Sequence, residues 1–181
     1  MEKLYLQKLM YSGGVTTKGA VKETVADFNI YIESVGVILL GSEMKDPPKR
    51  EWNDEDGIDV FYGAKPPMKD YDLEINCMAK ENTITDLRKA MTAFLSYLSG
   101  DDGSGNVFAI YDTYNSTGRR NVRFTGASPD VYYNLETDKE KFVKFKFKMH
   151  VDDPRTEVSL SYDKNDPSKL IELAYEVDDI Q

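Results

Sequence analysis

The sequence predicts an α+β fold in which most of the regular structure is β. Three observations lead to this prediction. The segment from Tyr71 to Met78 alternates between apolar and polar residues, residues 86–98 repeat apolar residues at helical spacing, and most of the patterned chain after them has the character of strands. We expect a single domain, because 181 residues is the length of one domain or of a domain with extensions.

The segment from Tyr71 to Met78 is the clearest predicted strand. Its apolar positions alternate with polar ones, the period of two that places one face on a core: Tyr71, Leu73, Ile75 and Cys77 against Asp72, Glu74 and Asn76. Cys77 falls on the apolar face, so we interpret it as a small buried hydrophobe and not as a reactive thiol.

A helix is predicted over residues 86–98. Thr83 and Thr85 can cap its start, and Asp86 places a carboxylate in the first turn. Its apolar residues recur at steps of three and four: Leu87, Met91, Phe94, Leu95 and Leu98. Gly100 is the expected end of the helix.

Further strands are predicted on both sides of this helix. Residues 28–40 indicate one or two strands broken at Gly36. After the helix, the predicted strands are residues 107–114, 121–125, 131–135 and 142–151, a strand marked by Val158, Leu160 and Tyr162, and a last element over 170–177 whose type stays open. In residues 142–151 we expect Val143, Phe145, Phe147, Met149 and Val151 to point inward, and Lys144, Lys146, Lys148 and His150 outward.

Two stretches carry few structure signals. Residues 1–29 are expected to form an N-terminal arm. Residues 41–68 are too long for an ordinary loop and contain Pro47, Pro48, Pro66 and Pro67, so we expect a protruding segment. The predicted organisation is therefore an arm (1–29), a core (30–154) carrying the protruding segment 41–68 and the helix 86–98, and a C-terminal strand and extension (155–181).

Charge and composition exclude several classes of function. The chain has 23 basic and 32 acidic residues, a net charge of −9 that disfavours binding to nucleic acid or to anionic lipid. One Cys and one His exclude a disulfide framework and a Cys/His zinc site. No signal peptide and no apolar run long enough to span a bilayer is visible, so we expect no membrane association.

The motifs of catalysis and metal binding are missing. The acidic run Asp54-Glu55-Asp56-Gly57 resembles a calcium loop, but the first ligand position falls on Trp52 and the closing position on Gly63. No phosphate-binding loop and no Gly-x-Ser-x-Gly elbow is present, and His150 is expected on the polar face of its strand. We therefore expect that the protein is not an enzyme and binds no cofactor or metal. A hydrolase that uses a pair of carboxylates is kept only as a minor alternative.

Two features remain to be explained. The row Lys144, Lys146 and Lys148 is interpreted as a salt-bridged surface or as an edge strand protected from aggregation, in preference to a nucleic-acid site. The aromatic residues of the long segment, Trp52, Phe61 and Tyr62, either fold back on the core or contact another chain, and we weigh the two alternatives equally.

The order of these parts resembles a known family. A strand through Ser34-Val35-Gly36-Val37 leads to Pro47-Pro48-Lys49, then to Trp52 and the step Glu55-Asp56-Gly57-Ile58-Asp59, and then to the alternating strand, the helix, the strand ending Phe145-Lys146-Phe147-Lys148-Met149 and the stop Asp152-Asp153-Pro154. This order resembles bacteriophage tail proteins of the distal-tail and tail-tube type, over residues 30–154.

The resemblance implies a β-sandwich or flattened barrel with one helix packed on its side and a long loop or hairpin that reaches a neighbouring subunit. It implies a virion tail protein, made in the bacterial host cytoplasm, that forms a homo-oligomeric ring, as a hexamer, with other tail proteins as partners and DNA passing through its channel. It implies no catalytic residues. By position, the subunit contacts are expected at Trp52, Ile58, Val60, Phe61 and Tyr62.

A different class of function stays open. A β-sandwich that binds a ligand, such as carbohydrate, could use the aromatic residues Tyr111, Tyr114, Tyr132 and Tyr133. For the tail protein, the charge of −9 leads to a separate expectation: Asp and Glu line the channel and repel DNA phosphate, while Lys144, Lys146 and Lys148 face elsewhere.

Overall fold

The computed structural model describes residues 3–35, 43–51, 56–61, 63, 65–133 and 140–176, and only the backbone of residues 129–133. The elements are β1 (Leu4–Ser12), β2 (Val15–Glu23), α1 (Thr24–Phe28), β3 (Ile30–Val35), β4 (Lys49–Glu51), β5 (Ile58–Val60), β6 (Tyr71–Glu81), α2 (Ile84–Ser99), β7 (Val107–Asp112), β8 (Thr117–Tyr133), β9 (Lys141–Val151), β10 (Ser159–Tyr162) and β11 (Leu170–Ala174). The α+β, mainly β class is confirmed.

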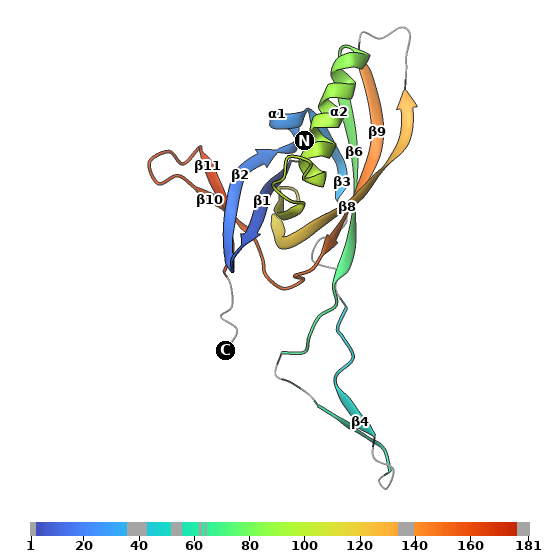
Figure 1. Ribbon diagram of the computed structural model, residues 1–181, viewed down its shortest axis with the longest axis vertical. Helices are drawn as coiled ribbons and strands as arrows, with labels where there is room; N and C mark the ends of the chain where they lie inside the picture. Colours follow the sequence, from blue (N-terminus) through green and yellow to red (C-terminus); the bar gives the residue numbers. More distant parts are fainter. Residues whose placement is uncertain are drawn as a thin grey trace.

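One antiparallel sheet of seven strands organises the molecule. Its order is β2-β1-β7-β8-β9-β6-β3, and β10–β11 and β4–β5 form two small sheets of their own. Strand β8 joins the two halves, because residues 117–123 pair with β7 and residues 122–133 pair with β9. The long strand therefore crosses the molecule from the β1–β2 side to the β9–β6 side (Figure 1).

The course of β8 corrects the prediction of two strands at 121–125 and 131–135. Gly126 and Pro129 indicated a turn, but both lie inside one strand, where the β8–β9 register shifts between Phe124 and Gly126 and between Pro129 and Val131. Such irregularities accommodate glycine and proline within a strand. The partner β7 pairs only as far as Arg123, so Pro129 removes no hydrogen bond from that side.

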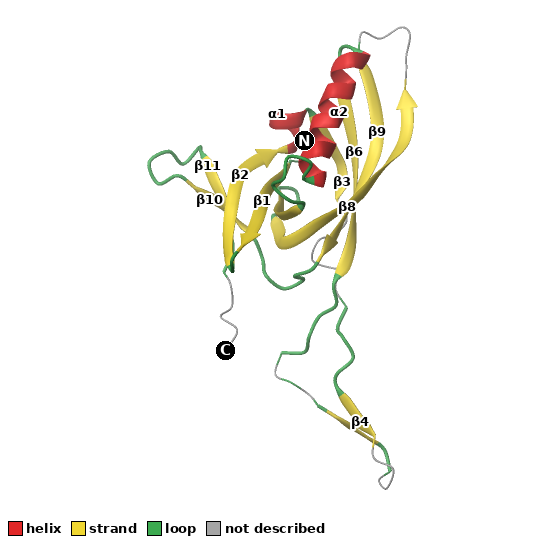
Figure 2. Ribbon diagram, viewed as in Figure 1, coloured by secondary structure: helices red, strands yellow, loops and turns green. Residues whose placement is uncertain are grey.

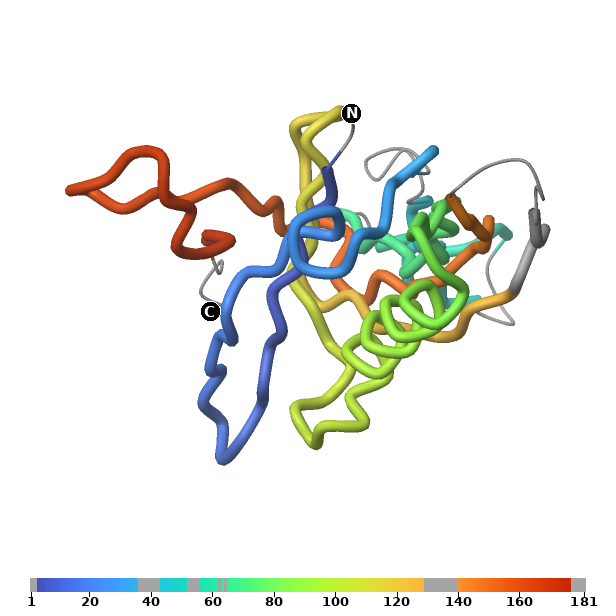
Figure 3. The backbone as a smooth tube through the Cα atoms, turned by 90° about the horizontal axis from the view of Figure 1, so that it is seen from above, coloured from blue at the N-terminus to red at the C-terminus, as the bar shows by residue number. Residues whose placement is uncertain are grey.

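Helix α2 covers one face of the sheet (Figure 2). Its buried residues are Leu87, Phe94 and Leu98, as the helical spacing predicted. The ring of Phe94 lies 5.4 Å from the ring of Phe147 on β9 and 5.3 Å from that of Phe28 on α1. Seen from above, the β1–β2 and β10–β11 hairpins lie on one side of α2 and β9 on the other (Figure 3). No helix in the described ranges is long and apolar enough to cross a membrane.

Both ends of α2 follow the predicted chemistry. The Thr83 hydroxyl accepts a hydrogen bond from the Asp86 backbone N–H at 3.1 Å and donates one to the Asp86 carboxylate at 2.7 Å. Gly100 closes the helix in the left-handed conformation, with φ of 78°. The helix begins two residues before the predicted bound and ends one residue after it.

The predicted N-terminal arm is wrong. Residues 4–23 form the hairpin β1–β2, and β1 lies inside the sheet between β2 and β7. Leu4 and Leu6 are fully buried in the main core, and α1 packs against α2. The first 29 residues are therefore, where described, part of the folded body, and the structure has two helices in its described part and not one.

The arm was mispredicted because β1 buries polar residues. The Gln7 side-chain amide donates to the Gly19 carbonyl at 2.8 Å and its oxygen accepts from the Leu173 N–H at 2.9 Å. The Lys8 side chain is only 5 % exposed, and its ammonium lies 3.0 Å from the Asp102 carboxylate. Gln7 and Lys8 break the apolar alternation expected of a buried strand. Their partners lie 12 to 166 positions away, so no local pattern shows that these polar residues are satisfied.

The predicted strands 71–78 and 142–151 are confirmed as β6 and β9, which pair along their whole length. The predicted inward residues of β9 are buried or nearly so: Val143, Phe145, Phe147, Met149 and Val151. Cys77 is fully buried, its thiol donates to the Phe145 carbonyl at 3.3 Å, and burial raises the pKa of that thiol, as expected of a structural cysteine.

A second, smaller core holds the C-terminal part of the chain. Val158 and Leu173 pack against Leu9 and Ala109, so the β10–β11 hairpin is seated on the β1–β7 side of the sheet. The open element at 170–177 is the strand β11, residues 170–174. The C-terminal strand expected after residue 155 is therefore present and has a partner strand.

Candidate interface on the projecting hairpin

The segment between β3 and β6 leaves the sheet and projects far beyond it (Figures 1 and 2). Its outer part is the two-stranded ribbon β4–β5, in which Lys49 pairs with Val60 and Glu51 with Ile58. We call the described residues of 43–69 the projecting hairpin. This agrees with the predicted protruding segment at 41–68.

Backbone hydrogen bonds close the projecting hairpin near the sheet. The Lys45 N–H donates to the Pro67 carbonyl at 2.8 Å, and the Lys69 N–H donates to the Glu43 carbonyl at 2.6 Å. The Lys69 ammonium also lies 3.0 Å from the Glu43 carboxylate. The two sides are thus joined at the base, as well as at the ribbon farther out.

Apolar side chains on this hairpin are left in solvent. Phe61 is 70 % exposed, Met44 66 % and Ile58 54 %, while Val60 is half-buried. The alternative that Phe61 folds back on the core is therefore wrong. The other two predicted contacts, Trp52 and Tyr62, lie outside the described residues.

The hairpin also forms a hollow of about 520 Å³ between its two sides. Its apolar lining consists of Met44, Pro47, Pro48, Phe61, Pro66 and Pro67, and the rest of the described lining is Lys45, Asp46, Gly63 and Lys65. Proline has no N–H for a strand ladder, so the two proline pairs separate the ribbon from the base. Met44 and the prolines were not among the predicted contacts, although the two Pro-Pro pairs were visible in the sequence.

The lysine row on β9 is a salt-bridged surface, which confirms one of the two preferred interpretations. Lys144 lies 2.5 Å from the Glu33 carboxylate, and Lys146 and Lys148 lie 3.1 and 3.7 Å from that of Glu74. The hydrogen bond from Lys146 lowers the pKa of Glu74. The edge-strand interpretation is wrong, because β9 lies between β8 and β6.

His150 lies on the same polar face, as expected, and is surrounded by carboxylates. Its Nδ1 is 2.8 Å from the Asp72 carboxylate and its Nε2 is 2.9 Å from that of Asp70. Among the described residues, no group of three or more His, Cys, Asp or Glu side chains is placed to hold a metal ion. The calcium-like run at 54–57 falls partly outside those residues.

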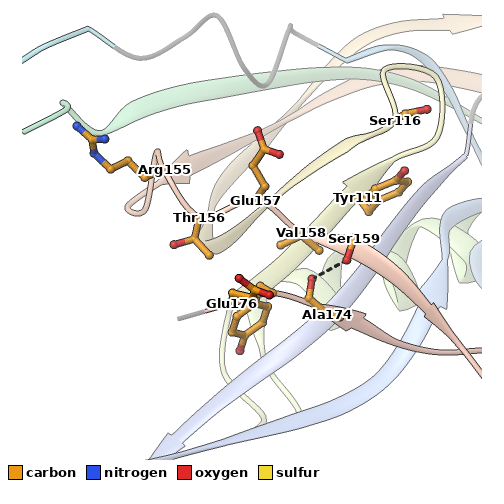
Figure 4. Close-up of a pocket in the computed structure, with 10 residues that line it drawn as sticks. Tyr111, Ser116, Arg155, Thr156, Glu157, Val158, Ser159, Ala174 and Glu176 are labelled. Atoms are coloured by element: carbon orange, nitrogen blue, oxygen red, sulfur yellow. Dashed lines mark hydrogen bonds between the residues drawn. The ribbon is translucent and has the colours of Figure 1, made fainter. Parts of the chain in front are cut away.

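The tyrosines of the carbohydrate-binding alternative lie near opposite ends of β8. Tyr111 on β7 pairs with Gly118 near the start of β8, whereas Tyr132 pairs with Val143 close to its end. Tyr111 lines a hollow of about 590 Å³ together with Ser116, Arg155, Glu157 and other residues of the C-terminal segment (Figure 4). Tyr114 is not among the described residues that line this hollow, and the side chains of Tyr132 and Tyr133 lie outside the described part of the structure, so the carbohydrate-binding alternative stays a prediction.

Comparison with solved structures finds proteins that are similar to this chain. One of them is the SPP1 Dit (gp 19.1) protein, which is described as a paradigm of the hub adsorption apparatus in phages that infect Gram-positive bacteria. The TM-score is 0.45 and the sequence identity 19 %; the match covers 84 % of this chain and 52 % of that one. This chain thus spans about half the length of that protein. No family model and no curated protein matches it.

Proposed function

We propose that this protein is a non-enzymatic structural subunit of a bacteriophage tail, of the distal-tail or tail-tube type, and that the projecting hairpin is its contact with a neighbouring copy. In this proposal several copies, six by resemblance, form a ring around a channel through which DNA passes. The observation that carries the proposal is a hairpin, closed at its base, that holds Ile58 and Phe61 in solvent away from the sheet.

Among the described residues, the projecting hairpin lacks a surface of its own chain on which to pack, and this favours contact with another subunit. A two-stranded ribbon is only marginally stable in water without a surface to pack on. Here the exposed apolar residues and the proline-lined hollow lie together on one projection. Exposed apolar patches of this kind mark surfaces that another protein covers. A second copy would supply the packing that the chain itself does not.

The order of the elements supports the tail assignment. A strand at Ile30–Val35 leads into the projecting hairpin, followed by the strand Tyr71–Glu81, the helix Ile84–Ser99 and the later strands. This is the order in which the sequence resembles distal-tail and tail-tube proteins. The hairpin occupies the position that the resemblance assigns to the segment reaching the neighbouring subunit.

The charge distribution is compatible with a channel that DNA passes without being gripped. The net charge is −9, and the lysines at 144, 146 and 148 are each paired with a carboxylate, Lys144 with Glu33 and the other two with Glu74. An acidic surface repels phosphate and so favours sliding over binding. In the assembled ring, we expect Asp and Glu to line the channel.

The assembly prediction is tested by changing the two exposed apolar residues of the hairpin. The double variant Ile58→Asp, Phe61→Asp should raise the concentration needed for assembly by about tenfold or more, because it places charged groups in the apolar contact. A tenfold change corresponds to about 1.4 kcal/mol of contact free energy. Sedimentation velocity over a concentration series measures this midpoint, and electron microscopy shows whether the assembled species is a ring.

The control is Ile84→Asp, which makes the same kind of change once, at an apolar residue, 47 % exposed, in the first turn of α2; the single variants Ile58→Asp and Phe61→Asp match it in charge. It should leave the assembly midpoint unchanged, and an acidic residue is favourable in that turn. If the hairpin variant and the control assemble alike, the hairpin is not the contact. If the assembled wild-type species is not a ring, the tail-ring assignment fails.

A further inference from the structure

His150 connects the sheet to the base of the projecting hairpin. One ring nitrogen, Nδ1, lies 2.8 Å from the carboxylate of Asp72, a residue of β6. The other, Nε2, lies 2.9 Å from the carboxylate of Asp70, which comes directly after Lys69 at the hairpin base and before β6 begins. A single imidazole therefore lies between two carboxylates, one from inside the sheet and one from its edge with the hairpin.

This geometry requires a particular protonation state. A neutral imidazole has one N–H and one bare nitrogen, so it can donate to only one carboxylate. The imidazolium has two N–H groups and can donate to both. Both nitrogens lie at hydrogen-bonding distance from carboxylate oxygens, so only the charged ring can donate to both carboxylates, and loss of its proton removes one of the two hydrogen bonds.

The charged groups around His150 come from several elements. Asp152 follows β9, with its carboxylate 3.6 Å from Nε2, and Arg123 on β8 binds that carboxylate at 2.6 and 2.9 Å. Lys148 is two positions earlier on β9 and is paired with Glu74. Lys45 of the hairpin base acts electrostatically on Asp70.

These surroundings favour the charged ring. The hydrogen bond with Asp72 is the largest cause that raises the pKa of His150 above its ordinary value, and the charge of Asp152 adds to it, against opposing contributions from burial and Arg123. The pKa of Asp70 is lowered, first by a hydrogen bond from its own backbone and then by His150.

The two contacts differ in how easily they can be lost. Asp72 lies directly opposite His150 in the β6–β9 ladder, so the register keeps the backbones of the two residues side by side. Asp70 lies outside that ladder and is continuous with Lys69, whose N–H closes the hairpin base onto Glu43. When His150 has a single N–H, Asp70 is therefore the partner that can move away, and the hairpin base moves with it.

We propose that His150 is a pH-responsive clamp on the projecting hairpin: as imidazolium it holds Asp70, and with it the hairpin base, against β9, and as neutral imidazole it releases them. The sign follows from the raised pKa. The stabilisation is fully present below the unfolded-state value of about 6.5 and is lost as the pH rises through the folded-state pKa. The hairpin base is thus tighter in mildly acidic solution. A consequence for assembly rests on the proposed function; the clamp itself does not.

The test uses the full chain at a concentration at which it is monomeric. His150 is the only histidine, so one imidazole signal in an NMR titration reports its pKa without assignment by mutation. In the same sample, hydrogen-exchange protection factors of the Lys45 and Lys69 amides report the opening of the hairpin base. We expect a pKa above 6.5, and protection that falls about two- to fivefold as His150 loses its proton, the range provided by an exposed ion pair.

Two variants and one control separate the clamp from a general effect of charge. Asp70→Asn should lower the pKa of His150 and remove the pH dependence of protection, and His150→Gln should remove that dependence as well. Asp101→Asn, in the turn after α2, should change neither quantity. A pKa at or below 6.5, or a pH dependence of protection that persists in His150→Gln, would overturn the proposal. Because no readout involves assembly, failure of the ring proposal would leave these results unchanged.

Discussion

Replacing Phe94 with alanine should lower the free energy of unfolding by about 3–5 kcal/mol, the usual cost of truncating a buried phenylalanine. Phe94 is fully buried at the centre of the main core. Its ring contacts Phe28 on α1 at a centroid distance of 5.3 Å and Phe145 and Phe147 on β9 at 6.3 and 5.4 Å. The cavity left by the truncation would lie where both helices meet the sheet, so few neighbours could move in to fill it.

Urea denaturation, followed by circular dichroism, measures this loss. The matched control is Phe61→Ala, the same chemical change at a phenylalanine that is 70 % exposed on the projecting hairpin. We expect the control to change the free energy of unfolding by less than about 0.5 kcal/mol. Equal losses in the two variants would mean that Phe61 is buried or that Phe94 is not.

Replacing Gly118 with alanine should lower the free energy of unfolding by about 3 kcal/mol, the upper end of what overpacking costs. A Cβ at this position would collide with the backbone oxygen of Ile110 and lie 2.9 Å from Cβ of Val158. The Val158 N–H donates to the Gly118 carbonyl at 3.3 Å, so the glycine seats the C-terminal segment on the sheet. We expect residues 155–174 to lose hydrogen-exchange protection before the rest of the chain does.

Gly63→Ala is the control for this prediction. Among the described residues, a Cβ there would meet Phe61 and Lys65 atoms at 3.6 and 4.0 Å, which is ordinary contact. The free energy of unfolding should change by less than about 1 kcal/mol. If Gly118→Ala keeps the wild-type midpoint in urea and full protection of the C-terminal segment, the described packing of that segment on β7 and β8 is incorrect.

The parts of the fold that could be predicted are those whose residues contact their sequence neighbours or one uniform core. In β6 the alternation from Tyr71 to Met78 is complete because one face meets the core and the other meets solvent and charged partners. In α2 the cap at Thr83 and the stop at Gly100 are local chemistry. For this reason the sequence predicts both elements to within a few residues.

The parts that were missed depend on distant partners. In β1, Gln7 and Lys8 are buried polar residues. Gln7 is hydrogen-bonded to Leu173 and Lys8 is paired with Asp102, and no local sequence pattern predicts such distant partners. In β8, Gly126 and Pro129 are tolerated because the register with β9 shifts beside each of them. Propensity indicated a turn there, and pairing with β9 overrode it.

The candidate interface was partly predictable in the same sense. The proline pairs and apolar residues of segment 41–68 showed that it would not be an ordinary loop, but they did not show whether Phe61 would pack on the core. That outcome depends on where the hairpin leaves the sheet, which is set by β3 and β6. The sequence does not predict the clamp at His150 for a similar reason. Asp72 comes to lie beside His150 through the β6–β9 register.

The central claim is that the projecting hairpin contacts a second copy of this chain, and site-specific photo-crosslinking tests it most directly. A benzophenone amino acid placed at residue 61, on the hairpin, should give covalent dimers on irradiation, whereas the same group at residue 84, on α2, should give none at equal protein concentration. Mass spectrometry of the dimer identifies the partner peptide. Crosslinks from residue 61 that stay within one chain, or dimers formed equally from both positions, would contradict the claim.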